Sequence, residues 1–179
     1  MIDPDRASLW LHRAGIVLVA LVLIFVKLLP LGSTAGEWPG PDIMLCLILA
    51  LVVRRPDYLP IWLVLLLVLL EDLLLLRPPG LWAALVVLAS EFVRSRGALT
   101  RELSFWVEWM LVAGVMVGLL VAYRVAFAIT FLPQAGFGFA MMQVLWSILC
   151  YPLVVGVLRI SLDLRKPATG EVDSYGRRL

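Results

Sequence analysis

The sequence is poor in charged residues, histidine and cysteine, and each shortage excludes a class of protein. Charged residues make up 16% of the 179 residues, whereas they make up about a quarter of an average soluble domain. The single histidine, His12, has no metal-ligand companions. The two cysteines, Cys46 and Cys150, lie in apolar runs without CxxC spacing, so we interpret them as small buried hydrophobic residues. We therefore expect no metal and no cofactor.

Catalytic and nucleic-acid-binding patterns are missing as well. No serine or cysteine has a base at a recognisable spacing, and no P-loop occurs. The net charge is only +2, without a basic patch on a soluble element, so nucleic acid is not an expected partner. Because catalysis needs a convergent set of titratable groups, we predict that the protein is not an enzyme.

Apolar residues, in contrast, make up 63% of the chain. They form six segments separated by turn or charged residues, and we predict an all-α polytopic membrane protein with a compact bundle of six transmembrane helices. The bundle covers residues 14–160, between a polar head at 1–13 and a flexible tail at 161–179. The segments are residues 14–31, 41–53, 60–80, 81–93, 104–132 and 139–160.

Four of these segments have unusual features. The second and fourth are short for a full crossing of the membrane. The fifth is overlong, so we expect it to tilt, break or protrude near Tyr123 and Arg124. Pro152 predicts a local kink in the sixth.

The distribution of positive charge predicts the orientation of the bundle. Twelve of the fifteen Lys and Arg residues fall in alternate connections, and only Lys27, Arg77 and Arg124 fall in the opposite set. Cytoplasmic loops of membrane proteins carry the excess of Lys and Arg. We therefore predict that both termini are cytoplasmic.

Two adjacent carboxylates, Glu71 and Asp72, lie inside the third apolar segment, Pro60 to Gly80. At ~1.5 Å per residue they lie roughly 16 to 18 Å along a span that crosses about 30 Å of hydrocarbon. A charge at this depth costs a few kcal/mol, so each carboxylate should face protein or water and have a partner. Neighbouring residues on a helix point about 100° apart, so we do not expect one group to serve both.

The three cations of the opposite set lie at a depth similar to that of four acids. One hypothesis is a buried ion network, because unpaired charges in the membrane are costly. The alternative, which we favour for the cations, is that their side chains extend to lipid headgroups while Glu37 and Asp42 are solvated. The cations are Lys27, Arg77 and Arg124, and the acids are Glu37, Asp42, Glu71 and Asp72.

Small residues recur every four positions along the fifth segment, at Gly114, Gly118, Ala122 and Ala126. Such a ladder lets another helix approach closely. We favour packing within the chain over a site for a partner. At the opposite end of the bundle, Glu91 and Arg94 have the spacing of a surface ion pair, and the tryptophans beside Glu108 are typical of an interfacial belt.

Several short motifs between residues 38 and 100 resemble one known family. They are Pro41-Asp42, Arg55-Pro56, Asp72 followed eight residues later by Gly80 in DLLLLRPPGLWAAL, and SEFVRSR. With the six-segment layout, they make the chain similar to the rod shape-determining protein MreD family, although the carboxy-terminal third matches only in hydropathy. Val68 stands where the family often has glycine. The matching residues are Pro41, Pro56, Asp72, Pro79 and Gly80.

The resemblance implies a non-enzymatic inner-membrane scaffold of the bacterial elongation machinery, which maintains rod shape during peptidoglycan synthesis. Its direct partner would be MreC, bound through its membrane helix or periplasmic base, and its indirect partners MreB, RodA and the penicillin-binding transpeptidase of RodA. The family is also likened to the substrate-binding subunits of energy-coupling-factor vitamin transporters, which implies a small-molecule carrier as the alternative. The candidate structural or partner-binding residues are Asp42, Glu71, Asp72, Arg77, Gly80, Gly114, Gly118 and Arg124; a carrier would use Glu71, Asp72, Lys27 and Arg124 around its cavity.

Overall fold

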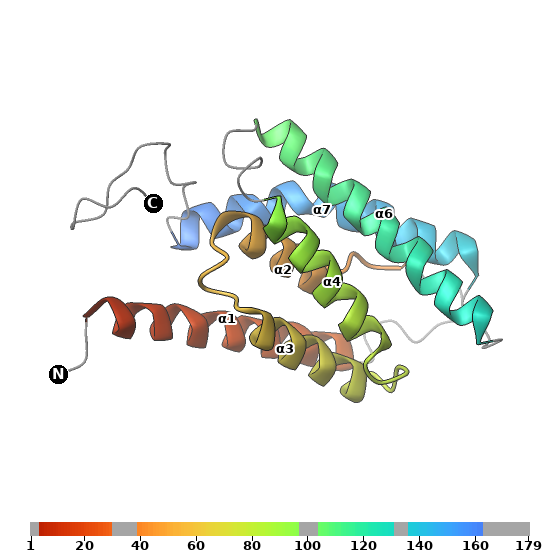
Figure 1. The fold of residues 1–179 in the computed structure, drawn as a ribbon, viewed down its shortest axis with the longest axis horizontal. Coiled ribbons are helices and arrows are strands. Elements are labelled where there is room, and N and C mark those ends of the chain that lie inside the picture. Colours follow the sequence, from red (N-terminus) through yellow and green to blue (C-terminus); the bar gives the residue numbers. More distant parts are fainter. Residues whose placement is uncertain (1–3, 30–38, 97–103, 131–135, 163–179) are drawn as a thin grey trace.

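The fold is entirely helical over residues 4–29, 39–96, 104–130 and 136–162, which a computed structural model describes, with side chains described between residues 9 and 160 (Figure 1). No strand occurs in these ranges, which confirms the predicted all-α class. The helices are α1 (Pro4–Leu28), α2 (Ile43–Arg54), α3 (Ile61–Leu74), α4 (Leu81–Ser95), α6 (Phe105–Ile129) and α7 (Phe137–Leu162).

Three of these helices are long and apolar enough to cross a membrane, at Leu9–Leu28, Phe105–Ile129 and Phe137–Ile160. The other three, α2, α3 and α4, have 12, 14 and 15 residues. At ~1.5 Å per residue they reach only about 18 to 22 Å, less than the roughly 30 Å of a hydrocarbon core. The three long helices indicate a membrane protein.

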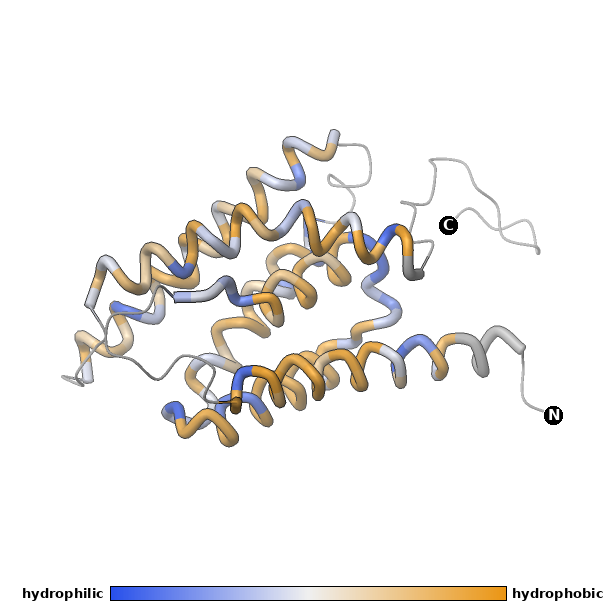
Figure 2. The backbone as a smooth tube through the Cα atoms, turned by 180° about the vertical axis from the view of Figure 1, so that it is seen from behind, coloured by the Kyte–Doolittle hydropathy of each residue, from blue (hydrophilic) through white to orange (hydrophobic). Residues whose placement is uncertain are grey.

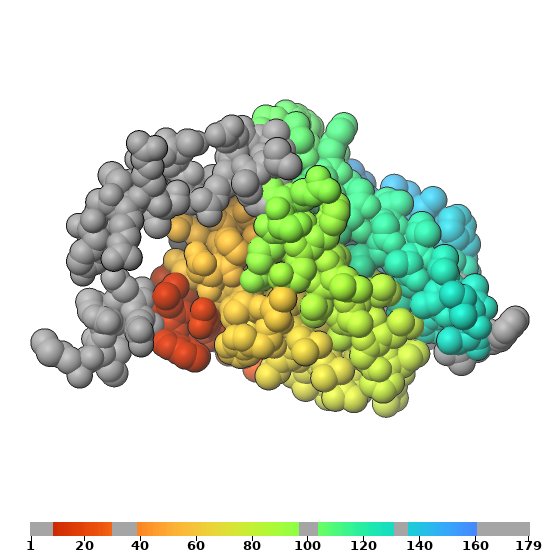
Figure 3. All heavy atoms as spheres, in the orientation of Figure 1, coloured from red at the N-terminus to blue at the C-terminus, as the bar shows by residue number. Residues whose placement is uncertain are grey.

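The shortest helix, α2, is the centre of the molecule. Eleven of its twelve residues are buried, and it packs against α7, α4 and α1 (Figure 1). Its residues are apolar on every side, as expected of a helix enclosed by other helices. Four further contacts complete the packing: α3 packs on α4 and α1, and α6 packs on α4 and α7. In Figure 3, α4 covers the space between α3 and α6.

The outward faces of the long helices are hydrophobic. Leu11, Leu18 and Leu153 are 74%, 64% and 70% exposed, and hydrophobic residues dominate the helices in Figure 2. Continuous exposed apolar surface of this extent is rare on soluble monomers and marks a membrane or protein contact. Lipid chains can therefore cover α1, α6 and α7.

Some local expectations differ from the structure, and others concern residues outside the described ranges. The predicted polar head is largely helix, because α1 begins at Pro4. The helix α6 is continuous over 25 residues, so the break considered near Tyr123 and Arg124 is wrong. Pro152 lies inside α7, whose helical assignment continues through it to Leu162. The tail beyond residue 162 and Glu37 lie outside the described residues.

Candidate functional site

Four charged residues meet where α1 and α3 end and α2 begins; we call them the ion cluster. The Lys27 ammonium lies 2.8 Å from Asp42 Oδ1 and 2.6 Å from Glu71 Oε1. Arg77 is further away, with Nη1 3.8 Å from the same Glu71 oxygen. Glu71 is 1% exposed, so its charge is compensated by protein rather than by water. These four residues are part of the ion network that the sequence suggested, which also included Arg124, Glu37 and Asp72. The favoured alternative, that the Lys27 side chain extends to lipid headgroups, is wrong.

Local sequence explains how Asp42 reaches this position. It is the N-cap of α2, and its Oδ1 also accepts a hydrogen bond of 3.1 Å from the Leu45 amide. The Asp42 amide donates to Ser147 Oγ at 2.8 Å, and that hydroxyl donates to the Gln143 carbonyl on α7. One residue thus joins the start of α2 to both α1 and α7.

Asp72 has a different partner from Glu71, as the 100° offset predicts. Its Oδ2 accepts hydrogen bonds from the amides of Gly80, at 3.3 Å, and Ala83, at 3.1 Å, so it caps the N-terminus of α4. Gly80 precedes that helix with φ 89°, in the left-handed region that favours glycine. The spacing of eight residues between Asp72 and Gly80 therefore lets the Asp72 carboxylate reach the first amides of α4 and hold the α3–α4 turn. The Asp72 Oδ1 atom is buried without a hydrogen-bond partner.

A second buried ion pair joins α2, α6 and α7 through three residues, which we call the Arg54 triad. Arg54 Nη2 lies 3.0 and 3.3 Å from the two carboxylate oxygens of Glu108, and the Tyr151 hydroxyl donates to Glu108 Oε1 at 3.0 Å. The side chains of Arg54 and Glu108 are 1% and 0% exposed. This triad was not predicted, because Arg54 was counted among the loop charges and Glu108 was given no role beside the tryptophans of the expected interfacial belt. The sequence did contain a signal for this pair, because Arg54 ends one apolar helix and Glu108 lies in the first turn of another.

The predicted surface ion pair is present, but only one of the two tryptophans of the predicted belt is exposed. Glu91 and Arg94 form the predicted ion pair, at 3.1 Å between Oε1 and Nε. Trp106 is exposed, as an interfacial residue should be. Trp109 instead donates from Nε1 to the Ile148 carbonyl at 2.9 Å, so it ties α6 to α7.

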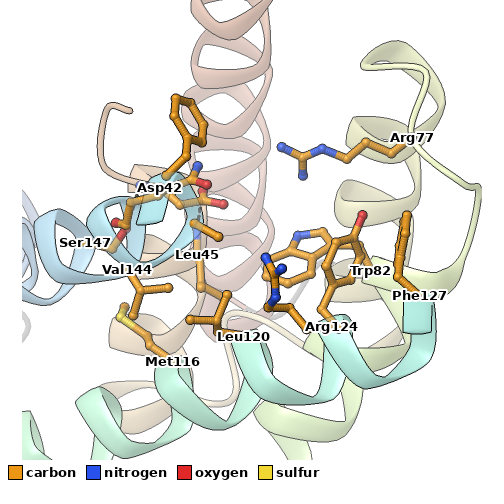
Figure 4. Close-up of a pocket in the computed structure, with 14 residues that line it drawn as sticks. Asp42, Leu45, Arg77, Trp82, Met116, Leu120, Arg124, Phe127, Val144 and Ser147 are labelled. Carbon is orange, nitrogen blue, oxygen red and sulfur yellow. Dashed lines mark hydrogen bonds between the residues drawn. The ribbon is translucent and has the colours of Figure 1, made fainter. Parts of the chain in front are cut away.

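A cavity of about 280 Å³ lies beside the ion cluster. Two arginines point their guanidinium groups into it from different sides, Arg77 from the α3–α4 turn and Arg124 from α6 (Figure 4). The guanidinium carbon of Arg124 is also 5.2 Å from the centre of the Phe137 ring. The remaining lining residues are mostly apolar or aromatic: Asp42, Leu45, Trp82, Met116, Leu120, Tyr123, Phe127, Phe139, Ala140, Gln143, Val144 and Ser147.

The glycines of the small-residue ladder do not pack within the described chain. Gly114 and Gly118 are exposed, and a methyl group added at either position would meet no atom within 4 Å. The expectation of intrachain packing is therefore wrong for these two residues, because α4 and α7 contact other faces of α6. Ala122 and Ala126 are partly buried.

The remaining candidates for chemistry are occupied by structural contacts. His12 stacks on Tyr58 with ring centres 4.8 Å apart. Both cysteines are free thiols, Cys46 buried and Cys150 half-buried. Within the described residues, no group of three or more His, Cys, Asp or Glu side chains could hold a metal ion. What the site offers is two cationic groups facing a largely apolar cavity, an arrangement suited to binding.

Comparison of the chain with family profiles, curated proteins and solved structures finds no match. Its function is therefore inferred from the contacts above and from the motif residues.

Proposed function

We propose that the chain is a non-enzymatic scaffold of the bacterial elongation machinery in the inner membrane, and that it binds MreC. The observation that carries the proposal is the position of the residues on which the resemblance to the MreD family rests. Asp42 caps α2 and belongs to the ion cluster, while Asp72 caps α4 through Gly80. The motif residues thus hold helix ends in place, which is the role that a shared fold would require of them.

The state of the buried acids also favours a scaffold. Glu71 and Glu108 are paired with cations, and Asp72 accepts from two backbone amides. A general base or nucleophile needs a carboxylate directed at a substrate. In the described chain these acids hold helices together instead.

The proposal includes six crossings with both termini in the cytoplasm. The short helices α2, α3 and α4 would then cross a locally thinned bilayer, which costs a fraction of a kcal/mol per Å of mismatch. Buried ion pairs at both ends of α2 suit this placement, because they remove charge from contact with lipid. The ion cluster and the cavity would lie at the periplasmic end of the bundle, near the periplasmic base of MreC.

The exposed glycine face of α6 is the proposed contact for the MreC membrane helix. Gly114 and Gly118 lie one turn apart with open space above both, and small residues at this spacing allow close helix packing in a membrane. Contacts to MreB, to RodA and to its transpeptidase would then be indirect, through MreC.

Capture from native membranes tests this proposal. The tagged full chain should recover MreC in a stoichiometric amount. Gly118→Leu should lower that recovery about tenfold, which corresponds to roughly 1.4 kcal/mol of helix packing. Gly15→Leu is the matched control, because Gly15 is also an exposed helical glycine with open space around it, on α1. A stable chain that captures no MreC would overturn the proposal.

A second candidate function, a small-molecule carrier, is favoured by the cavity beside the ion cluster. Its volume of about 280 Å³ is just below the roughly 300–1,000 Å³ typical of ligand pockets. Among the residues expected to serve a carrier, Arg124 lines the cavity, whereas Lys27, Glu71 and Asp72 do not. A water-soluble, vitamin-like molecule that co-purifies with the chain would support this candidate over the scaffold.

A further inference from the structure

The charged groups that line the cavity favour an anion as its ligand. Arg77 and Arg124 present their guanidinium groups to the empty space, whereas Glu71 and Asp72 do not line it (Figure 4). Asp42 does line the cavity, but its Oδ1 is held by the Lys27 ammonium and the Leu45 amide. The cavity wall thus carries one acid and the guanidinium groups of two arginines, and Arg77 keeps N–H donors for a ligand because its contact to Glu71 is long, at 3.8 Å. A guanidinium binds phosphate or carboxylate through charge-assisted hydrogen bonds, two at a time in the best geometry.

The rest of the wall suits hydrocarbon. Trp82, Tyr123 and Phe127 form a continuous aromatic surface, with ring centres 5.4 Å apart for the first pair and 4.6 Å for the second. Leu120 and Val144 add an aliphatic surface to the same cavity (Figure 4). A ligand with only a charged group would leave this apolar surface uncovered.

The cavity reaches the surface of the molecule near the start of α7. Phe139 lines the cavity and is also 50% exposed. The two helices at this opening, α6 and α7, are both apolar enough to cross a membrane. The opening therefore lies on a surface that lipid chains cover, so a membrane lipid has direct access to it.

We propose that this cavity binds the acidic headgroup of a membrane lipid between Arg77 and Arg124, with the lipid chain leaving past Phe139. The headgroup accepts hydrogen bonds from the two guanidinium groups, and the first part of the chain covers the aromatic wall. This inference does not depend on MreC, because every residue that it uses belongs to this chain.

The test is a titration of the delipidated full chain in detergent, followed by native mass spectrometry. Dihexanoyl phosphatidic acid should bind with one-to-one stoichiometry and at least tenfold more tightly than dihexanoyl phosphatidylcholine, a neutral lipid with the same chains. Equal binding of the two lipids would overturn the charge recognition. Inorganic phosphate that binds as tightly as the acidic lipid would overturn the assignment to a lipid.

Three variants assign the binding to this cavity. Arg77→Gln and Arg124→Gln should each weaken binding of phosphatidic acid about tenfold, because each removes a charge-assisted hydrogen bond. Ala140→Trp should abolish binding without changing any charge, because Ala140 lines the cavity and the indole fills it. Arg159→Gln is the matched control, since Arg159 stacks on Phe105 outside the cavity and its loss should change nothing.

Folding of each variant is checked by gel filtration and thermal unfolding. Arg77 contacts Glu71, so its replacement can lower stability, and Ala140→Trp then decides the question. Unchanged lipid binding in Ala140→Trp would overturn the proposal. Recovery of MreC measured on the same samples separates the two proposals, because a chain that binds lipid without MreC, or MreC without lipid, contradicts only one of them.

Discussion

Replacement of Glu108 by glutamine is the sharpest perturbation of the packing between α2, α6 and α7. In the Arg54 triad, the Arg54 guanidinium is 3.0 and 3.3 Å from the Glu108 oxygens, and both side chains are at most 1% exposed. Removal of one partner from a buried ion pair leaves an uncompensated charge and costs about 3–5 kcal/mol. Because the glutamine oxygen can still accept a hydrogen bond from Arg54, we expect the low end, about 3 kcal/mol. That loss lowers the folding equilibrium constant roughly a hundredfold.

Three further variants isolate the charge effect. Tyr151→Phe removes one hydrogen bond to a charged group but keeps the ion pair, so we expect a loss of about 1.5 kcal/mol. The combined variant Arg54→Met, Glu108→Leu and Tyr151→Phe should return to within about 1 kcal/mol of the native chain, because an apolar group of similar volume can replace a buried ion pair once the Tyr151 hydroxyl, which would lose its acceptor, is also removed. Glu91→Gln is the matched control at a partly exposed pair and should cost less than about 1 kcal/mol.

The assay is reversible unfolding of the full chain in mixed micelles with increasing denaturing detergent, followed by tryptophan fluorescence. The four variants should rank with Glu108→Gln as the least stable. If Glu108→Gln lost no more stability than Glu91→Gln, the triad would be hydrated, and the account of how α2 is held would be wrong.

The remaining predictions concern the other end of the bundle, with thermal unfolding of the purified chain as the measurement. Lys27→Met leaves two buried carboxylates without their nearest cation and should cost about 3 kcal/mol, whereas a loss below about 1 kcal/mol would place the ion cluster in water. Asp72→Leu should cost about 0.5–2 kcal/mol through the lost cap on α4, and Asp72→Asn clearly less, because asparagine still accepts from the Gly80 amide; equal losses would contradict the cap. Gly80→Ala should lose about 1–2 kcal/mol because its φ is 89°, whereas Gly15→Ala, inside α1, should gain about 0.5–1 kcal/mol; the same sign for both would contradict the backbone argument.

Features that depend on composition and local spacing could be predicted from the sequence. The helices were predictable because their apolar runs are bounded by proline, glycine and charge. The ion cluster was predictable as a hypothesis because Lys27, Asp42 and Glu71 stand out in apolar surroundings at similar depth. The divergence of Glu71 and Asp72 follows from helix geometry alone.

Features that depend on which helices are neighbours could not be predicted. Arg54 and Glu108 are 54 residues apart, and their pairing requires α2 to lie beside α6 and α7. Asp72 is paired with backbone amides rather than with a cation, and counting the charged residues in the sequence cannot show this. The outward position of Gly114 likewise depends on which face of α6 receives α4 and α7.

Labelling of single cysteines from either side of the membrane tests the central claim most directly, which is that the short helix α3 crosses the membrane with the ion cluster on the periplasmic side. In a chain whose two native cysteines are replaced, Asp57→Cys and Pro79→Cys lie in the turns before and after α3. An impermeant thiol reagent applied to intact cells should label Pro79→Cys at once, and Asp57→Cys only after the membrane is permeabilised. Labelling of both positions from the same side would contradict the six-crossing bundle.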